Sequence, residues 1–257
     1  MHIEPLGDQA VLITCRNEDE AATLAQTVRA KRPDWLVDIV LAYQSVALFY
    51  ELAKTTYGEA AAWCRNLAAL SDNGSGRTWS LRGRRSKKTD AMGPTDRPTR
   101  LHTVPCCYEL GPDLASVSEQ LRLSVDEIIR YHSSQPYRIF AIGFSPGFPY
   151  LGYLPAALGG LPRLDSPRKR VEPGSVGVTG RQTCVYPSAT PGGWRLIGRT
   201  PRILVDLEGD YFPLRPGDFV QFLPITSEQF EGQRGLRLDP PSEVPLKNVR
   251  QPAAQTA

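Results

Sequence analysis

The sequence predicts an α+β protein with a small N-terminal domain and a larger, β-rich C-terminal domain. Three observations indicate this class. Residues 1–70 alternate short apolar runs with two helical stretches, and residues 71–100 have no hydrophobic periodicity. Residues 143–200 hold 11 of the 22 glycines and 8 of the 23 prolines in a chain of 257 residues. Such a density excludes long helices there and favours short strands joined by turns.

The N-terminal domain is predicted over residues 1–76, with a ferredoxin-like arrangement. Asn17 is a plausible helix cap because its side-chain oxygen can accept a hydrogen bond from the first helical turn. Apolar periodicity places strands at 10–14, 36–42 and 46–50, and helices at 18–31 and 57–70. If a closing strand is supplied after the linker at residues 77–100, the order βαββαβ forms a layer of helices on an antiparallel sheet.

Residues 77–100 are predicted to form a basic, flexible linker. They carry eight Lys and Arg residues against Asp90 and Asp96, whereas the whole chain has a formal net charge of +3. The rest of the chain is therefore mildly acidic. A solvated tether between the domains fits this pattern better than a nucleic-acid surface does.

The C-terminal domain is predicted over residues 101–235. Ser124 and Glu127 have the spacing of a capping box, which places a helix start between them. Helices are expected at 114–122 and 125–132, and strands at 137–144, 175–179, 203–207 and 219–223. Many short strands separated by Gly and Pro turns suit a compact barrel or closed sandwich. Residues 236–257 form a polar tail that we expect to be weakly ordered.

Composition excludes several classes of protein. No stretch approaches the roughly 20 apolar residues of a membrane helix, and the N-terminus has no signal-peptide pattern, so we expect a cytoplasmic protein without a membrane partner. The five cysteines lack the paired spacing of zinc or redox sites, and no metal site is expected. They are scattered along the chain: Cys15, Cys64, Cys106, Cys107 and Cys184.

The stretch Gly143–Gly147 matches G-x-S-x-G, the nucleophile elbow of α/β-hydrolases, but we reject that interpretation. In that fold the catalytic histidine follows the serine, whereas all three histidines here precede Ser145. Pro146 also lacks the backbone N–H that would form half of the oxyanion hole. The motif is better explained as a turn stiffened by proline.

A series of blocks between residues 104 and 218 resembles one known family. They read VPCCYELGPDL, RYHSS, GFSPGFPYLGYLP, PGSVGVTGRQT, YPSATPGGW, IGRTP and LRPGD. The family includes the B component of bacterial 5-oxoprolinase, the histidine-kinase inhibitor KipI and the first subunit of allophanate hydrolase, all with a carboxyltransferase C/D-type domain. The sequence departs from the family at Glu172, where a proline is usual. The resemblance implies a cyclophilin-like β-barrel for the C-terminal domain.

The same resemblance indicates candidate site residues. His132 lies at the end of a predicted helix, where its only role can be a favourable interaction with the helix dipole. The family also has a histidine at this point. We therefore assign His132, with Arg168, a catalytic role in proton transfer or oxyanion binding. Planar guanidinium groups suit carboxylates and phosphates. The predicted substrate- or nucleotide-binding residues are Arg163, Phe144, Gly174, Ser175, Gln182 and Tyr186. Trp194 is assigned to the core first.

The resemblance implies the B component of an ATP-dependent 5-oxoprolinase, which cleaves 5-oxoproline to L-glutamate with C-type and A-type partner subunits. ATP, alone or with Mg²⁺, would be bound without a P-loop, since no GxxxxGK[ST] sequence is present. An alternative is a KipI-like inhibitor that binds a sensor histidine kinase. A component of a urea or allophanate amidase is a third hypothesis.

Overall fold

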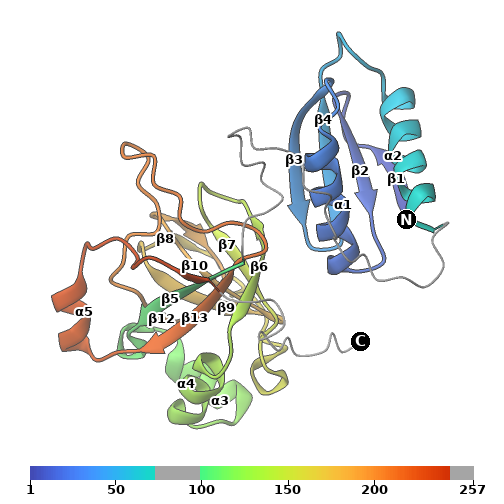
Figure 1. The fold of residues 1–257 in the computed structure, drawn as a ribbon. Helices are drawn as coiled ribbons and strands as arrows, with labels where there is room; N and C mark the ends of the chain where they lie inside the picture. The colour runs from blue at the N-terminus through green and yellow to red at the C-terminus, as the bar shows by residue number, and fades with distance from the viewer. Residues whose placement is uncertain (73–98, 244–257) are drawn as a thin grey trace. The chain divides into compact units, whose positions relative to one another are not determined.

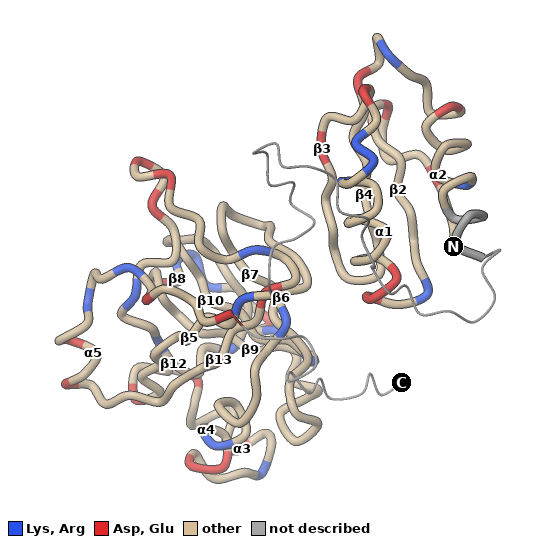
Figure 2. The backbone as a smooth tube through the Cα atoms, in the orientation of Figure 1, with Lys and Arg blue, Asp and Glu red and all other residues tan. Residues whose placement is uncertain are grey.

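The computed structural model describes residues 1–72 and 99–243, and within the helix that ends at residue 72 it describes no side chains from 68 onward. The chain divides into two compact units between Arg97 and Pro98 (Figure 1). Acidic and basic residues are distributed over both units (Figure 2). Each unit is described by itself.

The first unit is a four-stranded antiparallel sheet with two helices. Its strand order is β1-β2-β4-β3. Helix α1 contacts β3 and β4, and helix α2 contacts β1 and β2. The elements are β1 (His2–Pro5), β2 (Ala10–Thr14), α1 (Glu18–Lys31), β3 (Leu36–Ala42), β4 (Ser45–Tyr50) and α2 (Tyr57–Asp72). The predicted α+β class is confirmed.

The predicted source of the fourth strand is wrong. The sequence suggested a closing strand after the linker, but that place in the sheet is filled by β1, which pairs with β2 and sets Ile3 opposite Ile13. The chain order is therefore ββαββα rather than βαββαβ. The first strand after residue 98 is β5 (Arg100–Cys106), which pairs with strands of the second unit.

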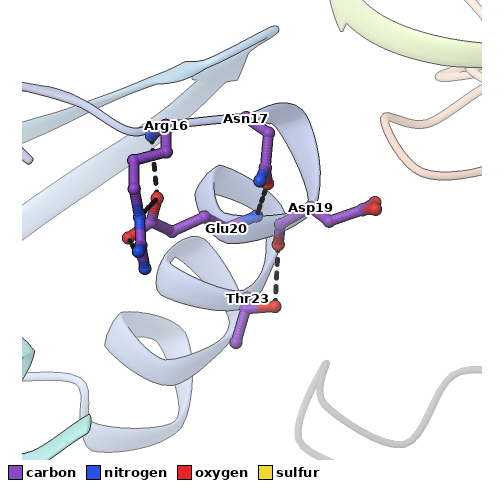
Figure 3. A network of polar contacts seen from close by, with 5 residues as sticks. All are labelled: Arg16, Asn17, Asp19, Glu20 and Thr23. Atoms are coloured by element: carbon purple, nitrogen blue, oxygen red, sulfur yellow. Dashed lines mark hydrogen bonds and ion pairs between the residues drawn. The ribbon is translucent and has the colours of Figure 1, made fainter. Parts of the chain in front are cut away.

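Helix α1 begins where the sequence predicted. Asn17 Oδ1 accepts a hydrogen bond from the backbone N–H of Glu20 at 2.8 Å, and the backbone N–H of Arg16 donates to the Glu20 carboxylate at 2.7 Å (Figure 3). Thr23 Oγ1 donates to the carbonyl oxygen of Asp19. The contact from Asn17 satisfies an N–H group that the first helical turn leaves unpaired.

The second unit contains an eight-stranded sheet, a two-stranded sheet and short helices. Helix α4 begins with the predicted capping box, in which Ser124 and Glu127 bond reciprocally. The helices are η1 (Tyr108–Leu110), α3 (Leu114–Leu121), α4 (Val125–Ser133), η2 (Ala156–Leu158) and α5 (Ser227–Gln233). Besides β5, the strands are β6 (Tyr137–Ile142), β7 (Pro149–Gly152), β8 (Arg168–Val171), β9 (Ser175–Thr179), β10 (Gln182–Val185), β11 (Thr190–Gly192), β12 (Arg195–Arg199), β13 (Phe219–Pro224) and β14 (Ser242–Glu243).

The large sheet has the strand order β12-β9-β10-β7-β6-β13-β5-β14, with β8 and β11 paired separately. Only the pairing of β13 with β5 is parallel among the described ladders. An isolated bridge joins Cys107, directly after β5, to Arg199 at the end of β12. The described ladders do not form a closed barrel, so the expected closure is not seen at the level of strand pairing.

Two further predictions differ from the structure. Residues 203–207 were expected to form a strand but make only isolated bridges at Ile203 and Asp206. The predicted tail from 236 is ordered as far as 243, because Leu238 is buried and β14 pairs with β5. Residues 77–98 of the predicted linker, which was expected over 77–100, and residues 244–257 lie outside the described residues, whereas Arg100 begins strand β5.

Each unit has its own hydrophobic core. That of the first unit packs helix residues such as Ala25 and Cys64 against Ile13 and Leu48 of the sheet. The main core of the second unit includes Val104, Tyr137, Ile139 and Phe222. A separate cluster joins Phe148, Val171, Cys184, Tyr186, Trp194 and Leu196, with Tyr150 packed against it.

Candidate functional site

His132 lies in the main core of the second unit and is completely buried. Its ring bridges Tyr108 and Thr183, with Nδ1 at 2.7 Å from Tyr108 Oη and Nε2 at 2.9 Å from Thr183 Oγ1. Thr183 Oγ1 itself donates to the carbonyl oxygen of Gly177. The Thr183 hydroxyl therefore accepts from Nε2–H, and in a neutral imidazole Nδ1 accepts from the Tyr108 hydroxyl.

This chain of hydrogen bonds suits a neutral imidazole. Burial lowers the pKa of His132 to about 3, because the charged form would lose its hydration in the core. The ring of Phe222 lies against it, with centroids 4.5 Å apart. The expectation that His132 projects toward a pocket is therefore wrong for the described structure, and its part in function stays a prediction.

Arg168, the second predicted catalytic residue, forms an ion pair with Asp113. Its Nη2 is 2.5 Å from Asp113 Oδ1, and Asp113 Oδ2 accepts from the backbone N–H of Leu196 at 2.7 Å. Asp113 directly precedes α3, so this carboxylate ties together α3, β8 and β12. Arg168 is thus already engaged with a protein carboxylate, which favours a positioning role over direct contact with a ligand.

Tyr186 belongs to the smaller cluster of the second unit. The rings of Phe148, Tyr150, Tyr186 and Trp194, named here the aromatic cluster, meet edge to face at centroid distances of 5.1–6.1 Å. Tyr186 is 1% exposed and Trp194 5%, so the assignment of Trp194 to the core is confirmed. Tyr186 is also core, and burial raises the pKa of its hydroxyl.

Arg163 and Phe144 lie at the edge of the aromatic cluster and are both exposed. Phe144 is 64% exposed and packs against Phe148 with centroids 5.3 Å apart. Burial raises the pKa of Tyr150, and the nearby positive charge of Arg163 partly offsets this rise. Phe144 therefore contacts the cluster directly, whereas Arg163 is related to it through its charge.

Gly174 and Ser175 lie between the aromatic cluster and a groove on the second unit. The backbone N–H of Gly174 donates to the carbonyl oxygen of Tyr186, and the Gly174 carbonyl accepts from Thr200 N–H at 2.8 Å. Gly174 has φ +83°, and a Cβ there would overlap the carbonyl oxygen of Thr200, so only glycine fits. Ser175 is buried in β9, and Gln182, half-buried, begins β10.

Gly174 also lines a groove of about 490 Å³ that none of the other predicted site residues reaches. Its wall contains three arginines that we did not predict: Arg199, Arg202 and Arg234. Arg199 lies in the IGRTP block, so a family motif in the sequence could have indicated this residue. Arg234 follows a helix with no such motif, and only folding brings it to the groove.

The described residues contain neither a cluster of metal-ligating side chains nor a helix that could cross a membrane. Within residues 1–72 and 99–243, no three His, Cys, Asp or Glu side chains gather as they would around a metal ion. The helices of the same residues are too short or too polar to cross a bilayer. All five cysteines are buried and free.

Comparison with known proteins identifies relatives. Residues 1–211 match the family described as carboxyltransferase domain, subdomain C and D. The 5-oxoprolinase B subunit of Escherichia coli O157:H7 is 52% identical over 141 residues, covering 54% of this chain and 63% of that protein. The protein of the same name from Bacillus subtilis (strain 168) is 42% identical over 138 residues, covering 52% and 57%. The match thus spans less than two thirds of either relative.

Two solved structures are similar to the chain. The protein TTHA0988 is 29% identical with a TM-score of 0.66, and the match covers 84% of this chain and 40% of that one. The urea carboxylase of Kluyveromyces lactis is 17% identical with a TM-score of 0.66, and the match covers 93% of this chain and 24% of that one. The second likeness shows the fold alone.

Proposed function

Because the chain belongs to the family of carboxyltransferase domains, subdomains C and D, we propose that it is the B-type subunit of an ATP-dependent 5-oxoprolinase. The complex would open the lactam of 5-oxoproline to L-glutamate. One observation carries the proposal: the proteins 42–52% identical to this chain are named as the B subunits of 5-oxoprolinases.

The proposal includes partner subunits of the C and A types. The chain corresponds to only 40% of TTHA0988, so a related unit exists within a longer polypeptide. A relative with a longer chain supports the idea that this chain works beside a second polypeptide. The names of the bacterial relatives describe each as one subunit of an enzyme, which agrees with a complex of several chains.

The chemistry requires activation of a poor electrophile. The lactam oxygen would take the terminal phosphoryl group of ATP and leave ADP. Water would then add to the ring carbon and the C–N bond would break, which gives an acyl phosphate and the free amine. A second water would hydrolyse the acyl phosphate to L-glutamate and inorganic phosphate. We propose that exposed Arg163 holds the carboxylate of 5-oxoproline while Phe144 contacts its ring. His132 and Arg168 would then position the elements that carry the site, since both are engaged inside the protein.

We also propose that the two units are variants of the ferredoxin-like and cyclophilin-like folds. The first unit has helices contacting a four-stranded antiparallel sheet, as a ferredoxin-like layer does. In the second, the bridge from Cys107 to Arg199 brings the β12 edge to the chain after β5, as a curled sheet requires. Both features support these assignments.

The test is ATP-dependent release of glutamate from 5-oxoproline. Three mixtures are compared: this chain alone, this chain with its C-type and A-type subunits, and those subunits without it. We expect activity only in the complete mixture. Activity that does not depend on this chain would contradict the proposal and would direct attention to binding of a sensor histidine kinase.

A substitution tests the binding role of Arg163. Arg163→Gln in the complete mixture should raise the KM for 5-oxoproline roughly tenfold, because one charge-assisted contact to a carboxylate is lost. The matched control is Arg130→Gln, an exposed arginine stacked over Tyr131 at 4.6 Å, which should leave KM unchanged. Equal KM values for both variants would remove Arg163 from the site.

A further inference from the structure

The groove beside Gly174 is built from four parts of the second unit, one of which is Pro187. Residues 173–174 form one side, residues 199–208 continue the wall, and Phe230 and Arg234 come from α5 and the residue after it. Lys and Arg segments of the backbone lie beside α5 in Figure 2. At about 490 Å³ the groove has the size of a small-molecule site.

Two guanidinium groups of the groove lie near the same aromatic ring. The Cζ atoms of Arg199 and Arg234 are each 6.0 Å from the ring centroid of Phe230, which is 3% exposed. Arg199 is held in place because its Nε donates to the carbonyl oxygen of Pro173 at 2.9 Å. Two like charges near one ring repel each other, and a bound anion would offset this repulsion.

Both guanidinium groups keep hydrogen-bond donors for a ligand. Arg199 uses only Nε, so its two terminal nitrogens make no hydrogen bond to any described residue. Arg234 uses only Nη1, in an exposed pair with Glu231 at 3.1 Å. A planar fork with open N–H groups matches the geometry of a carboxylate or phosphate group.

The other charges of the groove are partly balanced. Arg202 has only 10% of its side chain exposed, and it bonds to Asp239 and to the carbonyl oxygen of Arg237. Asp206 forms an ion pair with Arg237, in which Oδ2 lies 2.7 Å from Nη2. Glu208 also lines the groove, and its side chain makes no hydrogen bond or ion pair with the described residues, so its carboxylate opposes an anion there.

We propose that this groove binds an oxyanion group of a small molecule, a phosphate or a carboxylate, between Arg199 and Arg234. The site is separate from the predicted contacts of Arg163 and Phe144. The inference does not rest on the proposed oxoprolinase activity, because it concerns binding by this chain alone.

The first test is calorimetric titration of the full chain with inorganic pyrophosphate, ATP and 5-oxoproline at low salt. Binding of pyrophosphate and ATP identifies a phosphate ligand, and binding of 5-oxoproline alone identifies a carboxylate ligand. Either result supports an oxyanion site, and affinity should fall as salt is raised. If none of the three probes binds at millimolar concentration, the proposal is overturned.

Variants with opposite expected effects localise the binding. Arg234→Gln removes a largely exposed charge and should weaken binding roughly tenfold, whereas Glu208→Gln removes the opposing carboxylate and should strengthen it severalfold. Arg199→Lys keeps the charge but loses the planar fork, so it should also weaken binding.

The control is Arg130→Gln, which removes an exposed cation from an aromatic ring elsewhere in the same unit and should leave binding unchanged. Circular dichroism and the unfolding midpoint verify that each variant is folded. Equal affinities for Arg234→Gln, Glu208→Gln and Arg130→Gln would place the bound anion elsewhere and overturn the assignment.

Discussion

His132 shows how burial decides the chemistry of a residue. A histidine at the end of a short helix suggests a group ready for proton transfer, and helix α4 does end beside it. The structure instead places the ring between the Tyr108 hydroxyl and Thr183 in the main core. A neutral imidazole with one donor and one acceptor satisfies both neighbours, so we expect this residue to affect stability directly.

The first prediction concerns the pH dependence of unfolding. The pKa of His132 is lowered to about 3 in the folded protein, so the unfolded chain binds more protons between that pH and about 6.5. Protons therefore favour unfolding in this range. The contribution of His132 to stability is complete above pH 6.5 and falls by roughly 1.4 kcal/mol per pH unit below it.

Urea unfolding between pH 7 and pH 5 measures this effect. His132→Gln keeps a neutral group with a donor and an acceptor, and it should reduce the slope of unfolding free energy against pH. His2→Gln is the control, because the side chain of His2 is 71% exposed and should leave the slope unchanged. Identical slopes for the parent protein and His132→Gln would show that His132 is not held neutral.

Arg168 has a partner that the sequence did not predict. Pro167 and Arg168 suggested a guanidinium presented to a ligand, and the sequence contained no indication that Asp113, 55 residues earlier, would pair with it. Asp113 also accepts a hydrogen bond from the backbone N–H of Leu196, so its carboxylate links Arg168 to strand β12. A carboxylate with 11% exposure needs such hydrogen-bonding partners to replace the water that it loses on burial.

At the scale of elements, local sequence signals predicted where two of the helices begin. Asn17 and Ser124 cap the helices that they were expected to cap. Strand β1 was missed because Glu4 and Pro5 are poor strand formers, and it is stabilised by pairing with β2. The apolar run at 203–207 was mistaken for a strand, although Val205 instead packs against Gly147.

The second prediction compares two glycines with positive φ. At Gly180, φ is +54° and a Cβ would meet no atom within 4 Å, so Gly180→Ala should cost only about 1 kcal/mol of backbone strain. At Gly174 the added Cβ would also overlap the Thr200 carbonyl. Gly174→Ala should therefore lower the unfolding free energy by about 3 kcal/mol, as measured by urea denaturation.

The difference between these two variants isolates the close contact, because both share the backbone penalty. Gly174→Ala should in addition disturb the groove, since Gly174 bonds to Thr200 in its wall. Equal stability of the two alanine variants would contradict this prediction. It would mean that the loop carrying Gly174 moves away from the Thr200 carbonyl at no cost in free energy.

At the scale of the whole molecule, the chain consists of two units with independent cores. All four strands and both helices of the first unit come from residues 2–72, and its core draws on no residue beyond Leu67 among those described. Because β1 supplies the fourth strand from the N-terminus, the sheet needs nothing from the second unit.

The third prediction is that residues 1–76 fold as a separate polypeptide. Circular dichroism should show helix and strand, and urea should produce one cooperative transition of modest stability, since a domain of this size buries a limited core. Leu48→Ala is the internal check: it empties a completely buried position and should abolish the transition. A non-cooperative transition of the parent fragment would mean that the first unit depends on the rest of the chain.

The sequence alone determined the α+β class, the longer helices, several of the strands, the caps and the family, because these depend on local periodicity, turn chemistry and ordered motifs. The tertiary structure decided the burial of His132, the pairing of Arg168 with Asp113 and the meeting of Arg199 with Arg234 around Phe230. These last features join residues far apart in the chain, and long-range packing, rather than local preference, sets which side chains meet and which charges water can reach.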